Sequence, residues 1–368
     1  MKYFFIAGER SGDLHASNCI KELIKLDEQA EIQAWGGDYM EQAGAHILVH
    51  YRQLAFMGFW EVITNLLTIK KLLTQCKEQI IAYSPDVVVL VDYGGFNMKI
   101  AKFCSERGIK VFYYISPKVW AWNTKRALKI KRYVSRMFVI LPFEKQFFEQ
   151  FNYEVDYVGN PLLDAIRDYS LNANFHSDNQ LTEKPIVAVL PGSRKQEVNN
   201  ILSLLMPLVS RFPEYQFVVA GVDNLPSELY QSATGKGVKV LYNQTYDLLH
   251  EAHAAVVTSG TATLETALWR VPQVVVYKTS GFSYAIAKSL IKVPFISLVN
   301  LIMNKEVVRE LIQGELNQSN LEAELQGILA GPKRESVLED YQALAQIMGN
   351  EKASLQVARL IVKYLKEV

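Results

Sequence analysis

The stretch IVAVLPGSRKQEV, residues 186–198, joins a run of five aliphatic residues to a Pro-Gly-Ser-Arg turn and then to a helical pattern. An apolar run of this length, bounded by a turn, predicts a fully buried strand. A strand, a glycine turn and a helix N-terminus in succession direct backbone N–H groups to one place, where an anion is favoured. The stretch therefore predicts a parallel α/β domain with an anion site at Gly192, Ser193 and Arg194.

Similar aliphatic runs alternate with helical patterns on both sides of this stretch. The first set of predicted strands is Tyr3–Ala7, Ile32–Trp35, Val87–Val91, Val111–Ile115 and Met137–Leu141. The second set is Ile186–Leu190, Gln216–Ala220, Val238–Leu241, Ala254–Thr258 and Gln273–Tyr277. Continuous Val, Ile and Leu runs separated by helices indicate parallel sheets covered on both faces. We expect two Rossmann-like α/β domains whose sheets face a cleft.

The length of 368 residues also favours two domains. We expect domains at 1–166 and 186–333, joined by a polar, Asn- and Ser-rich linker at 167–185. The tail at 334–368 has an amphipathic helical pattern, and we expect it to pack back on the N-terminal domain. In such sheets ligands bind beyond the carboxyl ends of the strands, so the loops there are the candidate sites.

The composition is that of an ordinary soluble protein, with 49% hydrophobic residues and a net charge of +1. This balance argues against nucleic acid as a partner. The three cysteines are far apart in sequence, as expected of reduced thiols in the cytoplasm. The N-terminal apolar run is too short for a signal peptide, and no run reaches the length of a spanning helix. The sequence predicts a cytoplasmic protein that could still lie on a membrane surface.

Two loops of the first domain carry candidate acids. AGERSGD (7–13) contains Glu9, Ser11, Gly12 and Asp13; it is either a tight turn with Asp13 as a helix cap or a small-residue loop with room for a sugar or phosphate. Its glycine spacing is neither a dinucleotide fingerprint nor a P-loop.

The second loop lies in VVVLVDYGGFN (87–97), where Asp92 follows a predicted buried strand. Asp92 is either a turn residue or a partly desolvated general base, and Asn97 could cap the following helix.

Two further segments of this domain are unusual. No Asp or Glu occurs from Arg107 through Phe143, which is typical of a solvated basic helix but also suits an anionic substrate group or membrane surface. The cations considered for this role are Lys118, Lys125, Arg126 and Lys129. LAFMGFWEVITNLLTIKKLL (54–73) is either a core helix or an exposed amphipathic helix that docks on a membrane or receives acyl chains. Its candidate contact residues are Phe59, Trp60, Leu66 and Leu67.

In the second domain VVTSGTATLETAL (256–268) repeats the strand, loop and helix pattern. Ser259, Gly260 and Thr261 would present N–H groups to an anion, and Glu265 would lie one turn further along the same face. Glu265 is then either a helix-dipole residue or an acceptor for ribose hydroxyls. Together with the fork of Arg194, the two loops point to a nucleoside diphosphate.

No metal site is indicated by the sequence. It lacks a D-x-D pattern, and HEAH (250–253) is one residue short of a zinc-binding H-E-x-x-H.

The motifs AGERSGD, LAFMGFWEV, SPKVWAW, LPFEK, LPGSR, SGTATLE, SLVNLI and VVRELIQ stand in this order along the chain. In this it resembles the lipid-A-disaccharide synthases, GT-B glycosyltransferases of family 19, over essentially its whole length. The resemblance implies a metal-free inverting enzyme without a cofactor. It implies transfer of 2,3-diacylglucosamine from its UDP conjugate to 2,3-diacylglucosamine 1-phosphate, with release of UDP and formation of a β-1,6 disaccharide of lipid A biosynthesis.

The resemblance also assigns site residues. Asp92 matches the aspartate that opens the family's D-x-x-x-F-N loop, the expected base for the acceptor 6-hydroxyl. Arg194, Glu265 and Asn300 match residues of the nucleotide-sugar site. Many relatives carry a second carboxylate where this chain has Gly95, so Asp92 is expected to act alone or with Glu9 or Asp13.

Because the implied substrates carry fatty chains, we expect peripheral association with the anionic inner face of the cytoplasmic membrane, and a homodimer remains open. Two other classes are kept as alternatives. One is another GT-B enzyme of UDP-sugars, either a UDP-N-acetylglucosamine epimerase or a peptidoglycan-type transferase. The other is a non-catalytic protein that binds a nucleotide sugar or a lipid.

Overall fold

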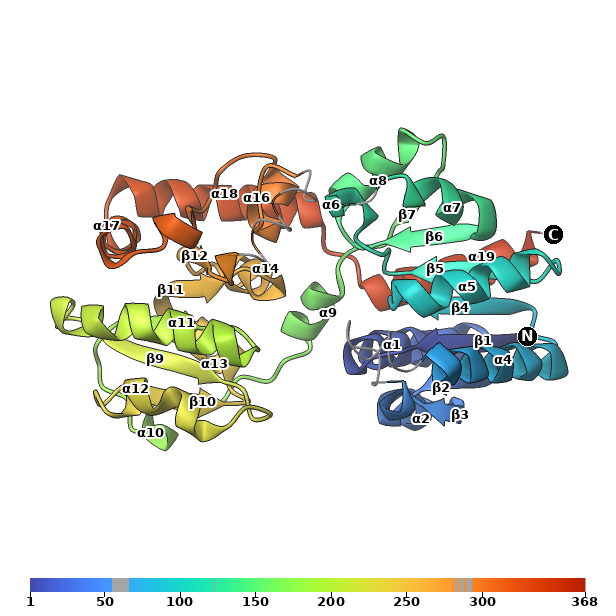
Figure 1. Ribbon diagram of the computed structural model, residues 1–368, viewed down its shortest axis with the longest axis horizontal. Coiled ribbons are helices and arrows are strands. Elements are labelled where there is room, and N and C mark those ends of the chain that lie inside the picture. Colours follow the sequence, from blue (N-terminus) through green and yellow to red (C-terminus); the bar gives the residue numbers. More distant parts are fainter. Residues whose placement is uncertain (55–65, 123, 282–283, 285–287, 289–292, 368) are drawn as a thin grey trace. The chain divides into compact units, whose positions relative to one another are not determined.

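The computed structural model describes residues 1–54, 66–122, 124–281, 284, 288 and 293–367. They divide into two compact units, each with its own parallel sheet (Figure 1). Unit 1 comprises Met1–Asp164 and Met348–Val368, and unit 2 comprises Ala165–Ile347. The α/β class and the parallel sheets predicted from the sequence are confirmed.

Unit 1 contains a seven-stranded sheet in the order β3-β2-β1-β4-β5-β6-β7, and every neighbouring pair is parallel. Its strands are β1 (Lys2–Ala7), β2 (Glu31–Gly36), β3 (His46–His50), β4 (Val87–Val91), β5 (Lys110–Tyr114), β6 (Arg136–Val139) and β7 (Asp156–Tyr157). Its described helices are α1 (Arg10–Leu26), α2 (Asp38–Gln42), η1 (Tyr51–Gln53), α4 (Leu66–Tyr83), α5 (Gly94–Ser105), α6 (Val119–Trp122), α7 (Arg126–Tyr133), α8 (Pro142–Glu149), α9 (Pro161–Arg167), which runs on into unit 2, and α19 (Ala353–Lys366).

The two faces of this sheet bury alternate residues of each strand. Tyr3 and Phe5 of β1 belong to a core under α1 and α19, whereas Phe4 and Ile6 belong to a core under α4, α5 and α7. Period-two alternation places consecutive side chains on opposite faces, and here both faces are covered by helices. This explains why the strands are continuous apolar runs in the sequence.

Unit 2 contains a six-stranded parallel sheet in the order β10-β9-β8-β11-β12-β13. Its strands are β8 (Ile186–Leu190), β9 (Gln216–Gly221), β10 (Lys239–Tyr242), β11 (Ala252–Thr258), β12 (Gln273–Tyr277) and β13 (Glu310–Ile312). Its described helices are α10 (Phe175–Asp178), α11 (Lys195–Leu205), η2 (Met206–Arg211), η3 (Ser227–Tyr230), α12 (Gln231–Thr234), α13 (Thr245–Glu251), α14 (Thr261–Leu268), α16 (Leu298–Met303), η4 (Gln313–Glu315), α17 (Gln318–Leu329) and α18 (Pro332–Met348).

The boundaries of the units differ from those expected. Phe175, inside the expected linker, is buried in a core of unit 2 together with Ile186 of β8 and Leu248 of α13. Of the tail expected to return to the first domain, α18 lies in unit 2 up to Ile347, and α19 alone completes unit 1. An amphipathic pattern marks a helix that packs on something, but it does not identify the surface it packs on.

The return of α19 is fixed by a buried polar contact. The carboxylate of Asp164 accepts hydrogen bonds from the N–H groups of Ala353 and Ser354 and from the Ser354 hydroxyl. It therefore caps the first turn of α19, whose Val357 and Ile361 then enter the core beneath α1.

Three strands of the structure were not predicted. They are β3, β7 and β13, short strands that lie at the ends of the two sheets. Edge strands are buried on fewer sides, so their sequences carry more polar residues and a weaker pattern. The ten strands that were predicted are all present, with shifts of at most two residues at their ends.

Candidate functional site

A pocket of about 360 Å³ in unit 2 lies where three strands end. Loops that follow β8, β9 and β11 line it, as the position of sites in parallel sheets requires. The seven residues predicted for the anion and nucleotide site in these loops all line this one pocket: Gly192, Ser193, Arg194, Ser259, Gly260, Thr261 and Glu265. The sequence did not identify Thr245, Gly221 and Glu197, which also line it.

The glycine turn of this pocket is stabilised by the chain itself. Glu197 Oε2 accepts hydrogen bonds from the N–H groups of Ser193 and Arg194, and its Oε1 lies 3.1 Å from Nη1 of Arg194. The sequence predicted that these N–H groups would be free for a ligand, and this detail is wrong. Gly192 forms the turn with a left-handed φ of 101°. The side chain of Arg194 is 78% exposed and lines the pocket, so its guanidinium remains accessible to a ligand.

The second loop of the pocket begins a helix. Because α14 starts at Thr261, its first N–H groups have no partners within the helix. Ser259 is fixed from outside the loop, since its hydroxyl donates to the carbonyl of Ile296 over 3.0 Å. The Ser259 N–H is also used, since it donates to the carbonyl of Val276 over 3.0 Å, so the expectation that Ser259 presents its N–H to a ligand is wrong. The donors that the loop offers to an anion are the N–H groups of Gly260 and Thr261.

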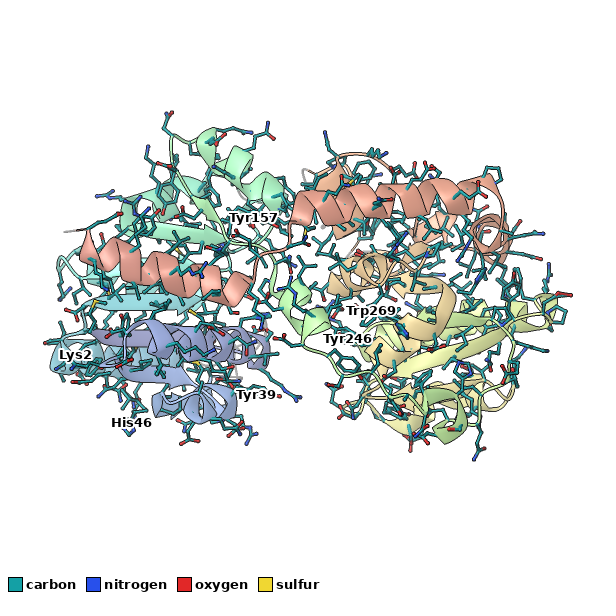
Figure 2. The ribbon with its side chains drawn as sticks, turned by 180° about the vertical axis from the view of Figure 1, so that it is seen from behind. Lys2, Tyr39, His46, Tyr157, Tyr246 and Trp269 are labelled. Carbon is teal, nitrogen blue, oxygen red and sulfur yellow. The ribbon has the colours of Figure 1, made fainter. Side chains whose placement is uncertain are left out.

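Glu265, one turn into α14, has a defined partner. The hydroxyl of Tyr246 donates to its Oε1 over 2.8 Å, and the Tyr246 ring packs on Trp269 at 5.7 Å (Figure 2). Burial raises the pKa of the Glu265 carboxyl, while the hydrogen bond from Tyr246 opposes that rise. Tyr246 was not identified from the sequence, because nothing in the sequence links it to a residue of the next loop along the chain.

Unit 1 contains a second pocket of about 510 Å³, lined by Asp92. Four cations share its walls: Lys99, Lys118, Arg126 and Lys129. Of the cations proposed from the sequence, Lys125 is exposed and does not line the pocket, and Lys99 was missed because it lies outside the basic stretch. Burial raises the pKa of the Asp92 carboxyl, while the charge of Lys118 opposes that rise. The pocket thus combines one carboxylate with a cationic wall.

Glu9 lies beside Asp92, as expected from their positions after the adjacent strands β1 and β4. Partial burial and the charge of Asp92 together raise the pKa of the Glu9 carboxyl. Ser11 and Gly12 lie in the first turn of α1, where Ser11 is exposed and Gly12 is buried against Ala7 and the Val91 carbonyl. Two interacting carboxylates at the mouths of neighbouring strands can divide the roles of base and electrostatic partner.

Comparison with known proteins matches residues 3–362 to the family model of lipid-A-disaccharide synthetase. A lipid-A-disaccharide synthase of Syntrophus aciditrophicus is 36% identical over 98% of this chain and 97% of its own length. One from Coxiella burnetii is 34% identical over 97% of this chain and 96% of its own. The chain belongs to the lipid-A-disaccharide synthase family. It is an enzyme of that kind.

Solved structures show the same fold at much lower identity. UDP-GlcNAc 2-epimerase of Neisseria meningitidis, solved with UDP-GlcNAc, has a TM-score of 0.69 at 13% identity and covers 100% of both chains. The glycosyltransferase of kitacinnamycin has a TM-score of 0.68 at 12% identity over 99% of both chains. These likenesses place this family member in the two-domain fold of GT-B enzymes.

In this synthase-family chain Asp13 has a different role from the one expected. It is fully buried, and its carboxylate accepts hydrogen bonds from the N–H groups of Gly37, Tyr39 and Met40 at 2.7, 3.1 and 3.2 Å. From α1 it thereby caps the first turn of α2, which packs against α1 on the same face of the sheet. A carboxylate occupied by three backbone donors is a structural residue, and we remove Asp13 from the candidate acids.

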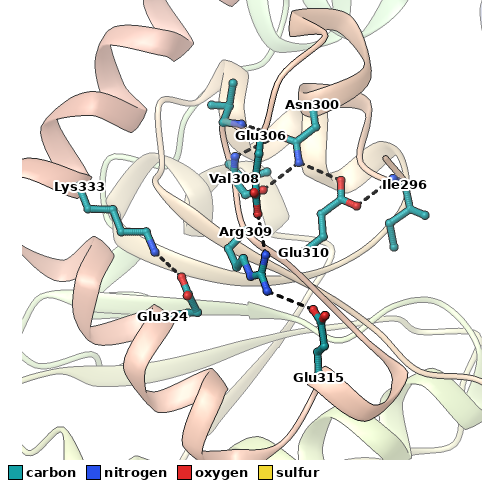
Figure 3. A network of polar contacts seen from close by, with 10 residues as sticks. Ile296, Asn300, Glu306, Val308, Arg309, Glu310, Glu315, Glu324 and Lys333 are labelled. Carbon is teal, nitrogen blue, oxygen red and sulfur yellow. Dashed lines mark hydrogen bonds and ion pairs between the residues drawn. The ribbon is translucent and has the colours of Figure 1, made fainter. Parts of the chain in front are cut away.

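Asn97 and Asn300 are likewise buried supports. Asn97 donates from Nδ2 to the carbonyls of Val91 and Asp92. Asn300 Oδ1 accepts from the N–H groups of Val307 and Val308, and its Nδ2 donates to Val308 O and to Glu310 Oε1 (Figure 3). With its side chain fully used and 0% exposed, Asn300 cannot contact a ligand without breaking this network.

The proposed lipid-facing residues are only partly described. Phe59 and Trp60 lie outside the described residues, and Leu66 begins α4. Leu67 is 84% exposed, and Lys70 and Lys71 lie one turn further along α4. Within the described ranges the helices are all too short or too polar to cross a membrane, and no cluster of three metal-binding side chains occurs.

Proposed function

We propose that this family member joins UDP-2,3-diacylglucosamine to 2,3-diacylglucosamine 1-phosphate and releases UDP. The observation that carries the proposal is the unit 2 pocket, which brings Arg194, the α14 N-terminus and Glu265 together around one cavity. A guanidinium fork and free helix N–H groups suit a diphosphate, and a buried carboxylate suits vicinal ribose hydroxyls.

The unit 1 pocket supplies the acceptor chemistry. Asp92 removes the proton of the acceptor 6-hydroxyl as that oxygen attacks the anomeric carbon of the donor, whose bond to the UDP oxygen breaks. The new bond forms on the face opposite the leaving group, so the configuration inverts. Lys99, Lys118, Arg126 and Lys129 hold the acceptor 1-phosphate, while burial and the charge of Asp92 raise the pKa of the neighbouring Glu9.

We propose that unit 1 also contacts the anionic inner face of the cytoplasmic membrane. Two exposed leucines, Leu67 of α4 and Leu128 of α7, are 84% and 55% exposed and stand among Lys70, Lys71, Lys125 and Lys129. The helix α5 packs against both α4 and α7, so the helices that carry the two leucines belong to one layer (Figure 1). Exposed apolar side chains ringed by Lys are the means by which a protein surface enters a lipid headgroup layer.

The decisive experiment is a mass-spectrometric assay with the two acylated sugars as the only substrates. A tetraacyl disaccharide phosphate formed together with UDP supports the proposal, and Asp92→Asn should abolish product while leaving UDP binding unchanged. If UDP-N-acetylglucosamine is epimerised and no disaccharide forms, the enzyme belongs with the epimerases in activity as well as fold. UDP binding without turnover of either substrate would instead indicate a binding protein.

Flotation with anionic liposomes at low salt tests the membrane contact. Leu67→Asn and Leu128→Asn should reduce the bound fraction, whereas Leu171→Asn, an equally polar change at an exposed leucine of unit 2, should not. Wild-type protein that stays with the soluble fraction at low salt would rule out this contact. Light scattering on the same preparation distinguishes a homodimer from a monomer.

A further inference from the structure

The backbone that carries Asp92 is held in an unusual conformation. Asp92 and Tyr93 both have left-handed φ values, 48° and 52°. Two consecutive non-glycine residues rarely adopt this region, and a bulky tyrosine there is a clear outlier. Such strain persists only where the surroundings hold it in place.

Two buried side chains hold this turn from beneath. The Tyr113 hydroxyl donates to the carbonyl oxygen of Asp92 over 2.5 Å, and Asn97 Nδ2 donates to the same oxygen over 2.8 Å. Both side chains are completely buried. The backbone N–H of Asp92 is also fixed, since it donates to the Tyr114 carbonyl of β5 over 3.0 Å. The N–H and the carbonyl of Asp92 therefore both have hydrogen-bond partners, which come from β5 and α5.

The outer side of the turn is closed by Tyr93. Its ring covers Gly8 so closely that a Cβ on Gly8 would lie 2.3 Å from it. Its hydroxyl donates to the Leu54 carbonyl over 3.4 Å. The turn is thus enclosed on both sides, and the Asp92 side chain is the part of it that lines the unit 1 pocket beside Lys118.

We propose that the Tyr113 hydroxyl, together with the Asn97 amide, is a positioning element that fixes the Asp92 carboxylate in its orientation as base. The inference rests on the proposed function, because it takes Asp92 as the group that removes the acceptor proton. Tyr113 does not line the pocket, so it acts through the backbone of Asp92 and not by touching substrate. Misplacement of a catalytic group by about 1 Å costs on the order of 10²-fold in rate.

The chain supplies a matched control one residue away. Tyr113 and Tyr114 are neighbours on β5 and both are fully buried, but they face opposite cores. Replacing either tyrosine by phenylalanine removes one buried hydroxyl group and leaves the ring in place. The hydroxyl that bonds the Asp92 carbonyl in the structure is that of Tyr113.

The experiment compares Tyr113→Phe and Tyr114→Phe in the full chain. We expect Tyr113→Phe to lower kcat by about 10- to 100-fold, with KM for both sugars and the Kd for UDP within about twofold of wild type. Tyr114→Phe should keep wild-type kcat. The thermal midpoints of the two variants should be similar. An equal effect of the two substitutions on kcat, or a loss confined to KM, overturns the proposal.

A second readout does not need turnover. The ¹³C resonance of the Asp92 carboxyl, assigned by its disappearance in Asp92→Asn, reports the titration of that group directly. As the turn relaxes toward solvent in Tyr113→Phe, the pKa of Asp92 should fall toward its ordinary value and stay unchanged in Tyr114→Phe. An unchanged titration in Tyr113→Phe overturns the positioning role. A wild-type enzyme that makes no disaccharide overturns the proposed function, and the resonance still decides whether Tyr113 orients Asp92.

Discussion

The hydroxyl of Tyr246 lies 2.8 Å from Oε1 of Glu265 and donates a hydrogen bond to it, so the carboxylate in the unit 2 pocket has a fixed orientation before any ligand arrives. The two residues come from the first turn of α13 and the second turn of α14, and neither motif alone reveals the pair.

The pH dependence of UDP binding should report this pair. Burial raises the pKa of Glu265, so its charged form, which accepts from ribose hydroxyls, is lost at a higher pH than for an ordinary glutamate near 4.3. Tyr246→Phe removes a donor that stabilises the charge, so the pKa should rise further. Calorimetric titration of UDP between about pH 5 and 8 should show affinity declining from a higher pH in Tyr246→Phe and unchanged behaviour in Tyr215→Phe. The same profile for all three proteins would exclude Glu265 as the ribose acceptor.

Arg194 should dominate diphosphate affinity. Replacing it by Ala removes a charge-assisted contact of about 1.5–3 kcal/mol, which corresponds to UDP binding weakened by about 10- to 150-fold. Arg211→Ala is the matched control, because Arg211 is an exposed arginine of unit 2 paired with Glu322 at 2.6 Å and outside the pocket. UDP affinity retained in Arg194→Ala would place the diphosphate elsewhere.

The pH at which kcat/KM falls on the acidic side should be higher than the pKa of a free aspartate carboxyl. Asp92 must be ionised to act as base, and burial raises its pKa, so kcat/KM should fall as pH drops through a value above the ordinary 3.9 or so. The charge of Lys118 opposes the rise caused by burial, so Lys118→Met should move this acidic limb of the profile to higher pH. Glu149→Gln, an exposed site on α8, should leave the limb where it is. An acidic limb left in place by Lys118→Met would mean that Lys118 does not act on the Asp92 carboxylate.

Asp13→Ala should destabilise the protein. Three backbone N–H groups at the start of α2, two of them buried, would lose their acceptor, which we expect to cost about 2–4 kcal/mol in the free energy of unfolding. Asp38→Ala, an exposed carboxylate in the first turn of the same helix, should cost at most about 1 kcal/mol. Urea denaturation measures both. A fully stable Asp13→Ala protein without activity would return Asp13 to the catalytic acids.

Glu144 should make stability depend on pH in an unusual direction. It is buried and accepts from Trp120 Nε1 and the N–H groups of Ile140 and Leu141, yet burial raises its pKa from 4.5 to about 7. The folded state binds the Glu144 proton more tightly than the unfolded state does. The contribution of Glu144 to the free energy of unfolding therefore falls as pH rises from about 4.5 to 7, by up to about 1.4 kcal/mol per pH unit. The difference in unfolding free energy between wild type and Glu144→Gln should show that slope, and Glu149→Gln should not alter it.

Much of the unit 2 site followed from the sequence for one physical reason. The carboxyl ends of parallel strands meet at one edge of a sheet, so the loops holding Arg194 and Glu265 had to converge. Asp13 and Asn300 were misjudged because a polar residue in a loop looks the same whether its partner is a ligand or a backbone N–H. Their partners, such as Gly37 and Val308, become visible only when the chain is folded.

Other residues of the two sites were not predicted at all, because their partners are also far away in the sequence or hidden in a regular pattern. Lys99 reaches the unit 1 pocket from α5, away from the basic stretch that drew attention to Lys118. Tyr113 lies in an apolar strand, where its hydroxyl gave no sign of the carbonyl it bonds. Glu197 belongs to the motif quoted first, but its role was not predicted. Its carboxylate accepts from the N–H groups of Ser193 and Arg194, which were expected to bind a ligand.

The placement of α19 has a consequence for how the polypeptide is made. Val357, Ala358, Ile361 and Val362 cover one face of the first sheet, yet they are translated only after the whole of unit 2. Unit 2 is continuous in sequence and can complete its core earlier. Unit 1 thus begins before unit 2 but is completed after it. A chain cut short before α19 would expose aliphatic surface on the first sheet, so a stop codon directly after unit 2 should yield an aggregating product and not a working enzyme.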